Sequence, residues 1–324
     1  MSVLLRESVL CDGNSVATRT ESVDNLLGEA PRILTMTEAE GVLYKVTGEE
    51  YLREAERSAE SLREHTPDVR VAIATDIDPV DSELFDDVIE MDELSEDEGV
   101  STLHPDLIPY EKTVFLDSDT LVSGDIRGLF TILDEFDLAV RLSPGGLSVP
   151  NLPEPWTEYN TGVIAYTDSG PVRELFALWN RYYEEWVSEK QDTGNQPAFA
   201  KALHDSDVDF FTLPPEYNCR VPRYGYLRNE AKIVHGRTSE GLSDVTRRLN
   251  AVPGARVYYP TLFPLSSNSI CIKGERKGLR SVVNLLHDGW HSLQQDGVKE
   301  TSVKVVQLLT GNYQRKRGEL DERE

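Results

Sequence analysis

The sequence predicts an α/β protein with a mostly parallel central sheet flanked by helices, because two observations agree. Apolar runs of strand length alternate with amphipathic helical stretches from residue 41 to residue 214. The first unit is strand–helix–strand, and a helix that joins two neighbouring strands of one sheet leaves them parallel. With 324 residues, the chain is long enough to bury a sizeable core.

The first unit is the clearest part of this pattern. Residues 41–48 (GVLYKVTG) form an apolar run that ends in glycine, and residues 49–65 place apolar side chains at helical spacing. Thr66 and Pro67 end that helix, and residues 69–76 (VRVAIATD) predict the second strand. Further along the chain we expect strands at 85–92, 112–119, 137–142, 160–167 and 208–214, and helices near 124–130, at 172–186 and at 195–204.

Three regions are expected along the chain. Residues 1–38 lack sustained periodicity and form an N-terminal extension, and residues 39–240 form the α/β domain. Residues 241–324 form a C-terminal loop and helical region in which the alternation is lost. There the composition predicts a loop rich in Pro and Ser at 253–269, followed by helices near 279–295 and 299–310.

The chain is strongly acidic, with a net charge of −24, and only 10 of its 33 basic residues are lysines. This composition resembles that of proteins from salt-accumulating halophilic archaea, where molar salt screens the self-repulsion. An acidic protein of ordinary origin is the alternative. A charge of this sign argues against general nucleic-acid binding, because phosphate contacts need a basic face.

We expect a cytoplasmic protein without a transmembrane segment. No apolar run reaches 18 residues, and Arg6 and Glu7 interrupt the stretch that a signal peptide would need to be apolar. The cysteines Cys11, Cys219 and Cys271 are widely spaced and odd in number, which predicts neither a disulfide framework nor a zinc site.

A basic segment, KGERKGLR at 273–280, precedes an apolar stretch. It leaves open a peripheral association with anionic lipid, beside the simpler interpretation as a solvated helix. High salt would weaken such an attraction.

Two aspartates, Asp117 and Asp119, follow the apolar run Val114–Leu116. In an extended chain they point to the same side while Ser118 points away, and two carboxylates about 6 Å apart repel each other unless a cation or a proton lies between them. The carboxyl end of a central strand is where open α/β sheets bind ligands. A divalent cation, a shared proton and a helix cap are the three candidate explanations.

A basic segment contrasts with this acidic chain. Residues 71–111 contain no Lys or Arg, whereas residues 217–238 contain a group of cations, which we call the basic island, and only one acidic residue, Glu230. The island is either salt-bridged structure or an anion site. Its members are Arg220, Arg223, Arg228, Lys232 and Arg237.

Six segments, in order between residues 41 and 240, resemble glycosyltransferase family 8, the glycogenin-like retaining enzymes of GT-A fold. The segment 110–130 (YEKTVFLDSDTLVSGDIRGLF) resembles the family's Asp-x-Asp segment, and residues 42–76 resemble its first strand, helix and second strand. The other four resemble an Asn-x-Gly-Val strand, a helix beginning Asp-Gln-x-Ala, a Leu-Pro-x-x-Tyr-Asn turn and an Ile-x-His segment. They are YNTGVIAY (159–166), GNQPAFAKAL (194–203), LPPEYNCR (213–220) and KIVHGR (232–237).

The resemblance implies a transferase that moves a sugar from a nucleotide-diphosphate donor, expected to be a UDP-sugar, with retention of anomeric configuration. It implies a Mn²⁺ or Mg²⁺ ion held by Asp117, Asp119 and His235 and bridging the diphosphate. The acceptor, whether a glycan, a lipid-linked sugar or a protein, is not identified by the sequence.

The resemblance also implies roles for further residues. The nucleotide would contact residues at the end of the first two strands, and Asn160 and Gln196 would face the donor sugar, with Gln196 near the anomeric carbon. The expected nucleotide and donor contacts are Val46, Thr47, Tyr51, Asp76, Asp117, Ser118, Asp119 and Arg237.

The chain departs from the family pattern at three places. Family members usually have a Lys or Arg near the donor in the segment before the Asp-x-Asp strand, and residues 71–111 have none. Family members often have Lys-Pro-Trp after the histidine, and here the chain reads His235-Gly236-Arg237-Thr238-Ser239, so Arg237 is the candidate phosphate contact. Asn195 stands where the family commonly has Asp before Gln. An inactive donor-binding scaffold is therefore one alternative, and a sugar nucleotidyltransferase is another, although no Gly-rich phosphate loop follows the first strand.

Overall fold

The computed structural model describes residues 40–77, 80, 83–91, 102–146, 149, 151–188, 195–260 and 269–275. The expected N-terminal extension, Cys11 and the helices expected at 279–295 and 299–310 lie outside these residues. Among the helices that the structure describes, none is long and apolar enough to cross a membrane.

The first strand–helix–strand unit forms as predicted. Strand β1 (Glu40–Val46) leads through Thr47 and Gly48 into helix α1 (Glu49–His65), and β2 (Arg70–Thr75) pairs with β1 in parallel. Gly48 has a φ of 78°, a left-handed conformation that favours glycine at this tight strand-to-helix turn. Strand β3 (Asp87–Glu90) then adds to β2, also in parallel.

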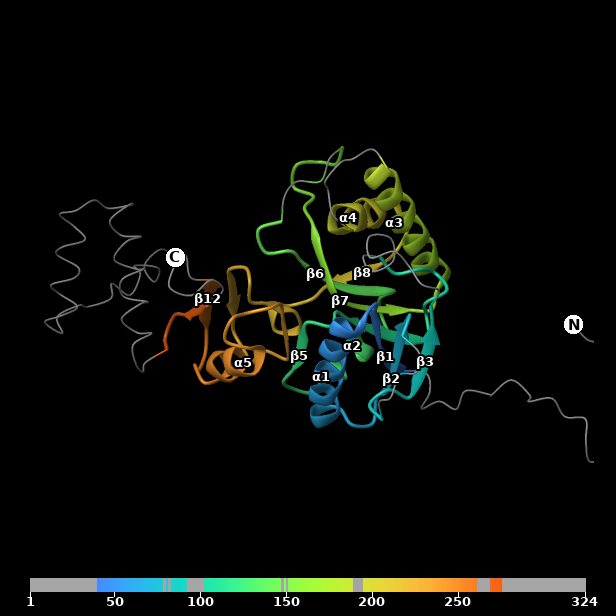
Figure 1. Cartoon of the computed structure of the whole chain (residues 1–324). Coiled ribbons are helices and arrows are strands. Elements are labelled where there is room, and N and C mark those ends of the chain that lie inside the picture. The colour runs from blue at the N-terminus through green and yellow to red at the C-terminus, as the bar shows by residue number, and fades with distance from the viewer. Residues whose placement is uncertain are drawn as a thin grey trace, which may run out of the picture. The chain divides into compact units, whose positions relative to one another are not determined.

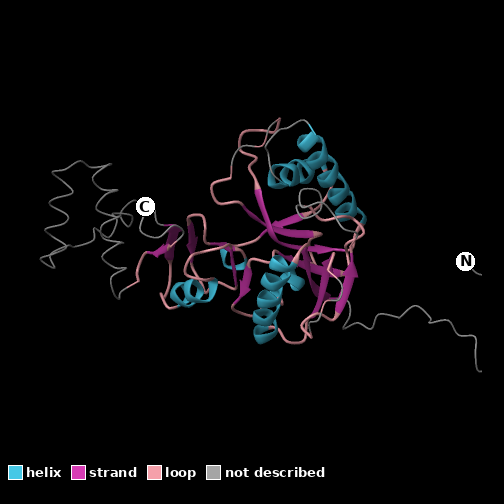
Figure 2. Ribbon diagram, viewed as in Figure 1, coloured by secondary structure: helices cyan, strands magenta, loops and turns pink. Residues whose placement is uncertain are grey.

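A seven-stranded sheet in the order β3-β2-β1-β4-β7-β6-β8 forms the centre of the domain (Figure 2). Neighbouring strands run parallel except at β7, which is antiparallel to both β4 and β6. The predicted α/β class with a mostly parallel sheet is therefore confirmed. The four strands that follow β1 in this order are β4 (Lys112–Leu116), β7 (Tyr159–Thr167), β6 (Leu138–Leu142) and β8 (Phe210–Thr212).

Helices cover both faces of this sheet (Figure 1). Helix α1 and the short α2 (Gly128–Ile132) pack on one face, and α3 (Gly170–Ser188) and α4 (Asn195–Asp205) pack on the other. Alternate residues of β1 show the two-sided burial, since Val42 belongs to the first cluster and Leu43 to the second, each fully buried. Strands buried on both faces explain why the sequence shows continuous apolar runs.

Two smaller sheets lie beyond the end of β4. One pairs β5 (Thr120–Val122) with β11 (Ile233–His235), and β9 (Cys219–Arg220) adds to β11. The other consists of β10, β12 and β13, and helix α5 packs against its core. These elements are β10 (Gly225–Leu227), β12 (Arg256–Pro260), β13 (Ile270–Ile272) and α5 (Leu242–Asn250).

The expectation of a loop over 253–269 was wrong for its first part, because residues 256–260 form strand β12. Strands of three to five residues carry too few alternations to stand out against Pro and Ser neighbours. Strand β10 lies before residue 240 and pairs with β12 after it, so a sheet joins residues on both sides of the expected boundary. The three-region division itself stays a prediction.

A buried guanidinium ties α5 to this last sheet. Arg248 is 7% exposed and forms ion pairs with Glu240, which is equally buried, and with Glu275 at 2.8 Å. It also donates to the carbonyl oxygen of Ile270 at 2.8 Å. Arg247, one residue earlier, is 72% exposed in its ion pair with Asp244.

Substitution Arg248→Met is expected to lower the free energy of unfolding by about 3–5 kcal/mol, because it leaves the buried carboxylate of Glu240 without the guanidinium of Arg248 as its partner. Denaturant unfolding in molar KCl measures the change. Arg247→Met is the matched control on the same helix and is expected to change stability by no more than about 0.5 kcal/mol. Equal effects of the two substitutions would contradict the conclusion that the buried ion pairs of Arg248 stabilise this part of the fold.

Candidate metal centre and adjoining cleft

The turn that follows β4 directs both aspartates into the same space. The sheet pairing continues one residue past the strand, because Asp117 N donates to the carbonyl oxygen of Gly162 at 2.9 Å. Thr120 Oγ1 then donates to the carbonyl oxygen of Asp117 at 2.8 Å and is itself hydrogen-bonded to Ser58 on α1 at 2.7 Å. The turn is therefore fastened from within and from the neighbouring helix.

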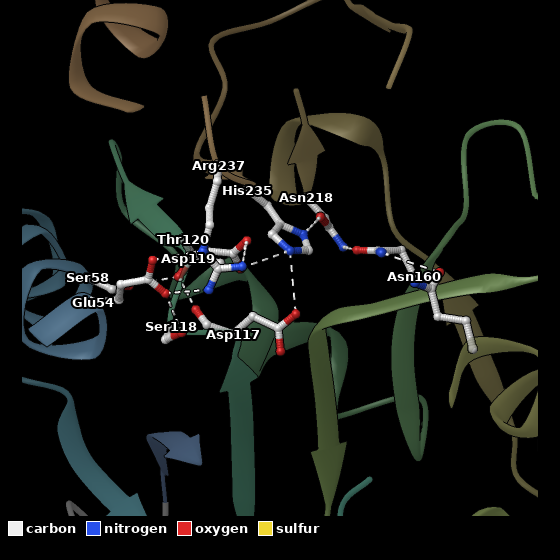
Figure 3. Close-up of polar contacts among 11 residues, drawn as sticks. Glu54, Ser58, Asp117, Ser118, Asp119, Thr120, Asn160, Asn218, His235 and Arg237 are labelled. Atoms are coloured by element: carbon white, nitrogen blue, oxygen red, sulfur yellow. Dashed lines mark hydrogen bonds and ion pairs between the residues drawn. The ribbon is translucent and has the colours of Figure 1, made fainter. Parts of the chain in front are cut away.

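The small sheet brings a histidine to the aspartates. In the β5–β11 pairing His235 stands opposite Thr120, and Gly236 N donates to the carbonyl oxygen of Asp119 at 2.9 Å. Nε2 of His235 lies 3.4 Å from Oδ2 of Asp117 and 3.3 Å from Oδ1 of Asp119 (Figure 3). The structure thus brings together the three side chains that the sequence resemblance grouped.

The three groups form a site of suitable size and chemistry for a divalent cation. One possible ligand atom from each of the three residues lies within 4.8 Å of the other two, which is close enough for all three to bind one metal ion. The His235 side chain is 4% exposed, Asp119 is 15% exposed and Asp117 is 41% exposed. The site is therefore buried on the histidine side and open on the side of Asp117.

The charges of the three groups are interdependent. Burial alone would lower the pKa of His235, but the carboxylates of Asp117 and Asp119 outweigh it and raise that pKa to about 9. Burial alone would raise the pKa of Asp119, and the hydrogen bond and charge of His235, with Arg237 and Arg220, lower it. Without a metal, a protonated His235 acts as the counter-charge between the two carboxylates.

Glycine at position 162 allows this close approach. A Cβ at Gly162 would lie 2.1 Å from Cε1 of His235 and 2.6 Å from Oδ2 of Asp117. Gly162 lies within an irregularity of the β6–β7 pairing, because Val140 stands opposite Ile164 and the next residue, Arg141, stands opposite Asn160. A bulge with a tight backbone approach at this Asn-x-Gly segment explains both observations.

A cleft of about 290 Å³ adjoins the three ligands. It is lined by eight of the side chains that the sequence analysis selected, from both the nucleotide and the sugar ends of the expected site. These are Val46, Tyr51, Asp117, Ser118, Asp119, Gln196, His235 and Arg237.

Three selected residues lie elsewhere. Thr47 is 7% exposed and does not line the cleft, and Asp76 accepts a hydrogen bond from Gly48 N at 3.0 Å at the start of α1. Asn160 is 1% exposed and lies behind Gln196, with its Nδ2 3.5 Å from Oε1 of Gln196. Asn160 can therefore act on a ligand in the cleft only through a neighbour.

Four further residues line the cleft. Sequence reasoning named Arg220 only as a member of the basic island and Asn195 only as a departure from the family pattern. It missed Lys45 and Thr161. Lys45 is a lysine in the middle of an apolar strand, a signal that could have been followed. Its Nζ donates to the carbonyl oxygen of Thr102 at 2.7 Å, and burial lowers its pKa to about 8. Thr161 sits next to a selected residue and had no separate signal.

The two arginines of the cleft differ in their partners. Arg237 pairs with Glu54 at 2.5 Å and with Asp119 at 3.4 Å, and its guanidinium lies 5.5 Å from the ring centre of Tyr51. Arg220 has no ion pair with any carboxylate in the part of the chain that the structure describes, and burial lowers its pKa. Ser118 also donates to Glu54, at 3.0 Å. The basic island therefore supplies two guanidinium groups to the cleft. That of Arg237 is already paired with carboxylates, and that of Arg220 is not.

Comparison with known proteins gives distant structural likenesses. No protein-family model and no curated protein matches the chain by sequence. Among solved structures, the glycosyltransferase GlyE of Streptococcus pneumoniae TIGR4 aligns with 65% of this chain and 60% of its own, at 18% identity and a TM-score of 0.46. The galactosyltransferase LgtC aligns with 65% of this chain and 95% of its own, at 11% identity and a TM-score of 0.43.

Mouse xyloside xylosyltransferase 1 aligns with 61% of this chain and 97% of its own, at 14% identity and a TM-score of 0.41. All three proteins are glycosyltransferases. This chain spans about 60% of the length of GlyE, the first of them. Because all three TM-scores are below 0.5, the assignment of the α/β class is based on the strand order of this chain and not on these likenesses.

The protonation of His235 predicts how metal affinity depends on pH. Below a pH of about 9 a metal ion must displace the proton on His235, so the apparent affinity for Mn²⁺ is expected to rise by about tenfold per pH unit and to level off above pH 9. Titration of free Mn²⁺ by electron paramagnetic resonance measures it. His235→Asn is expected to bind more weakly with a flat pH profile, and a flat profile for the unchanged protein would contradict the assignment.

The metal-free protein is expected to show the opposite trend in stability. The pKa of His235 is raised from 6.5 to about 9 on folding, so its stabilising contribution is fully present below pH 6.5 and is lost as the pH rises through about 9. Denaturant unfolding with chelator present, compared with His235→Asn, isolates this contribution.

Proposed function

We propose that the protein is a metal-dependent glycosyltransferase that moves a sugar, expected to be a hexose, from a nucleotide-diphosphate donor, expected to be a UDP-sugar, to an acceptor with retention of configuration. The observation that carries the proposal is the convergence of Asp117, Asp119 and His235 at the carboxyl end of the central strand β4, beside a cleft. The ordered sequence segments supply the reaction type. The acceptor would be a glycan, a lipid-linked sugar or a protein.

The ligand set fits Mn²⁺ or Mg²⁺. Two carboxylates and one imidazole nitrogen are ligands that Mn²⁺ accepts, and three protein ligands leave room for oxygens of a diphosphate. Nε2 of His235 is directed at the carboxylates, at 3.3 and 3.4 Å, because Nδ1 on the other side of the ring is already hydrogen-bonded to Asn218. When bound, the metal would offset negative charge on the diphosphate leaving group.

The remaining selected residues would position the donor on either side of the metal. We propose that Val46, Thr47, Tyr51 and Asp76 lie at the nucleotide end. In support, Val46 and Tyr51 line the cleft, and Tyr51 is 42% exposed, which leaves its ring free to contact a base. Ser118 would contact the nucleotide at the turn itself. Gln196 would face the sugar, supported from behind by Asn160.

The cleft also needs a positive charge for a diphosphate in a chain of net charge −24. We propose that Arg220 and Lys45, which both line the cleft, supply this charge. Arg237 is paired with Glu54 and Asp119, so binding a phosphate would require it to give up those partners. Arg220 would bind without that cost, since no described carboxylate pairs with it.

Two alternatives are separated by experiment. A sugar nucleotidyltransferase would need a Gly-rich phosphate loop after β1, and the β1–α1 connection consists only of Thr47 and Gly48. An inactive scaffold would bind the donor without turnover. We also propose that the protein works in the cytoplasm of a salt-accumulating halophile, for which the support is its charge and its low lysine content.

Purified protein incubated in molar KCl with Mn²⁺ and a panel of UDP-sugars is expected to release UDP, and chelation of the metal is expected to abolish release. Asp119→Asn is expected to lower kcat/KM by about 10²–10³-fold, because the diphosphate loses its metal. Asp106→Asn, which alters an exposed carboxylate away from the cleft, is the control. Donor binding without turnover would favour the scaffold, and full activity of Asp119→Asn would exclude the metal assignment.

The cation assignment predicts a ranking of three arginine variants. Arg220→Met is expected to weaken UDP binding in the presence of Mn²⁺ by about tenfold or more, because a charge-assisted hydrogen bond is lost. Arg237→Met is expected to have a smaller effect. Arg223→Met, in the basic island but outside the lining of the cleft, is expected to have none. Isothermal titration calorimetry measures the three affinities, and a larger loss for Arg237→Met than for Arg220→Met would reverse the assignment.

A further inference from the structure

Asn218 connects the two halves of the candidate site. Its side chain is fully buried, in the segment between the turn of 3₁₀ helix at Pro215–Tyr217 and strand β9. Oδ1 of Asn218 lies 3.1 Å from Nδ1 of His235, and Nδ2 of Asn218 donates to Oδ1 of Asn160 at 2.8 Å (Figure 3). One amide thus contacts both the metal-site histidine and the residue behind Gln196.

The direction of these hydrogen bonds follows from metal binding. A histidine that binds a metal through Nε2 carries its proton on Nδ1, so Nδ1–H donates to Oδ1 of Asn218. The NH₂ group of Asn218 must then face Oδ1 of Asn160, and the NH₂ group of Asn160 must face Oε1 of Gln196, 3.5 Å away. A doubly protonated His235 gives the same direction, because Nδ1 donates in that state as well.

The series of contacts ends in the cleft. Gln196 lines the cleft, and its Oε1 is the acceptor of Asn160. Its own NH₂ group is therefore the end that remains for a ligand. A ligand group beside Gln196 would meet N–H donors, which select an oxygen such as a sugar hydroxyl or ring oxygen.

The backbone around Asn218 is held in place from two sides. The guanidinium of Arg141 on β6 donates to the carbonyl oxygen of Asn218, and Arg141 stands opposite Asn160 in the β6–β7 pairing. Cys219, the next residue, pairs with Val234 beside His235. The backbone segments that carry His235, Asn218 and Asn160 are thus tied to one another independently of the side-chain contacts.

We propose that Asn218 is a positioning residue with two roles. It fixes the ring of His235 for metal binding, and through Asn160 it orients Gln196 so that N–H groups face an oxygen of the donor sugar. The second role rests on the proposed glycosyltransferase function, whereas the first concerns metal binding alone.

Two substitutions at this position separate the roles. Asn218→Asp keeps an oxygen acceptor for Nδ1–H of His235 but removes the donor to Asn160, and it has nearly the same volume. Asn218→Ala removes both groups. Asn180→Ala is the structural control, because Nδ2 of Asn180 donates two part-buried hydrogen bonds, to the carbonyl oxygens of Leu103 and Phe176, and Asn180 does not line the cleft.

The first measurement is the affinity for Mn²⁺ alone, without nucleotide, on variants whose thermal unfolding shows an intact fold. Asn218→Ala is expected to weaken Mn²⁺ binding by about 10–100-fold, the usual effect of removing a partner of a metal-binding histidine. Asn218→Asp and Asn180→Ala are expected to bind Mn²⁺ as the unchanged protein does, within a few-fold. Unchanged Mn²⁺ affinity in Asn218→Ala, or equal losses in Asn218→Asp and Asn218→Ala, would overturn the first role.

The second measurement compares the affinity for UDP with that for the UDP-sugar that is turned over fastest, with Mn²⁺ saturating. Asn218→Asp is expected to reduce the preference for the UDP-sugar over UDP and to leave UDP binding unchanged. An unchanged preference would overturn the second role. If no UDP-sugar binds to any variant, the proposed function and the second role both fail, and the Mn²⁺ measurement still decides the first role.

Discussion

The repulsion between two carboxylates at the end of a buried strand is the constraint on which the rest of the site depends. The strand ends at Leu116, and the turn that follows, in which Thr120 Oγ1 donates to the carbonyl oxygen of Asp117, directs the side chains of Asp117 and Asp119 into the same space. Without a metal, His235 supplies the compensating charge, at 3.3 and 3.4 Å from the two carboxylates. The raised pKa of His235 and the lowered pKa of Asp119 express the same interaction. A divalent cation would take over this role with a larger charge.

Several features of the fold make sense as means of bringing that histidine to the aspartates. The chain leaves the central sheet after β4 and forms β5, whose partner β11 arrives from more than 100 residues further along. Gly162 leaves the space for the imidazole ring beside β7. Thr120, Ser58 and Tyr44 form a line of hydrogen bonds that holds the turn against α1. The main sheet therefore positions the carboxylates, and the small sheet positions the nitrogen.

The distribution of charge around the site follows from the acidity of the whole chain. In a protein of net charge −24, a cation beside a carboxylate is readily paired, as Arg237 is with Glu54. Of the cations that line the cleft, Arg237 is paired in this way, whereas Lys45 and Arg220 form no ion pair with a carboxylate that the structure describes. Lys45 has a backbone carbonyl as its partner, and burial lowers the pKa values of both Lys45 and Arg220. An anionic ligand would favour their charged forms, which links anion binding to the protonation of Lys45.

The sequence by itself determined the α/β class, the first strand–helix–strand unit and the three metal-ligand candidates, because long apolar periodicities and ordered local segments are visible without contacts. It also led to the selection of Tyr51 and Gln196, which line the cleft. The tertiary structure decided what depends on residues distant in sequence. Strands β5, β9 and β11 are too short to be recognised from alternation, yet they create the contact between His235 and the aspartates. Contacts between residues far apart in the sequence also decide which side chains pair with Arg237, that Arg220 stays without an ion pair among the described residues, and that Asn218 lies between His235 and Asn160. A sequence pattern does not contain such contacts.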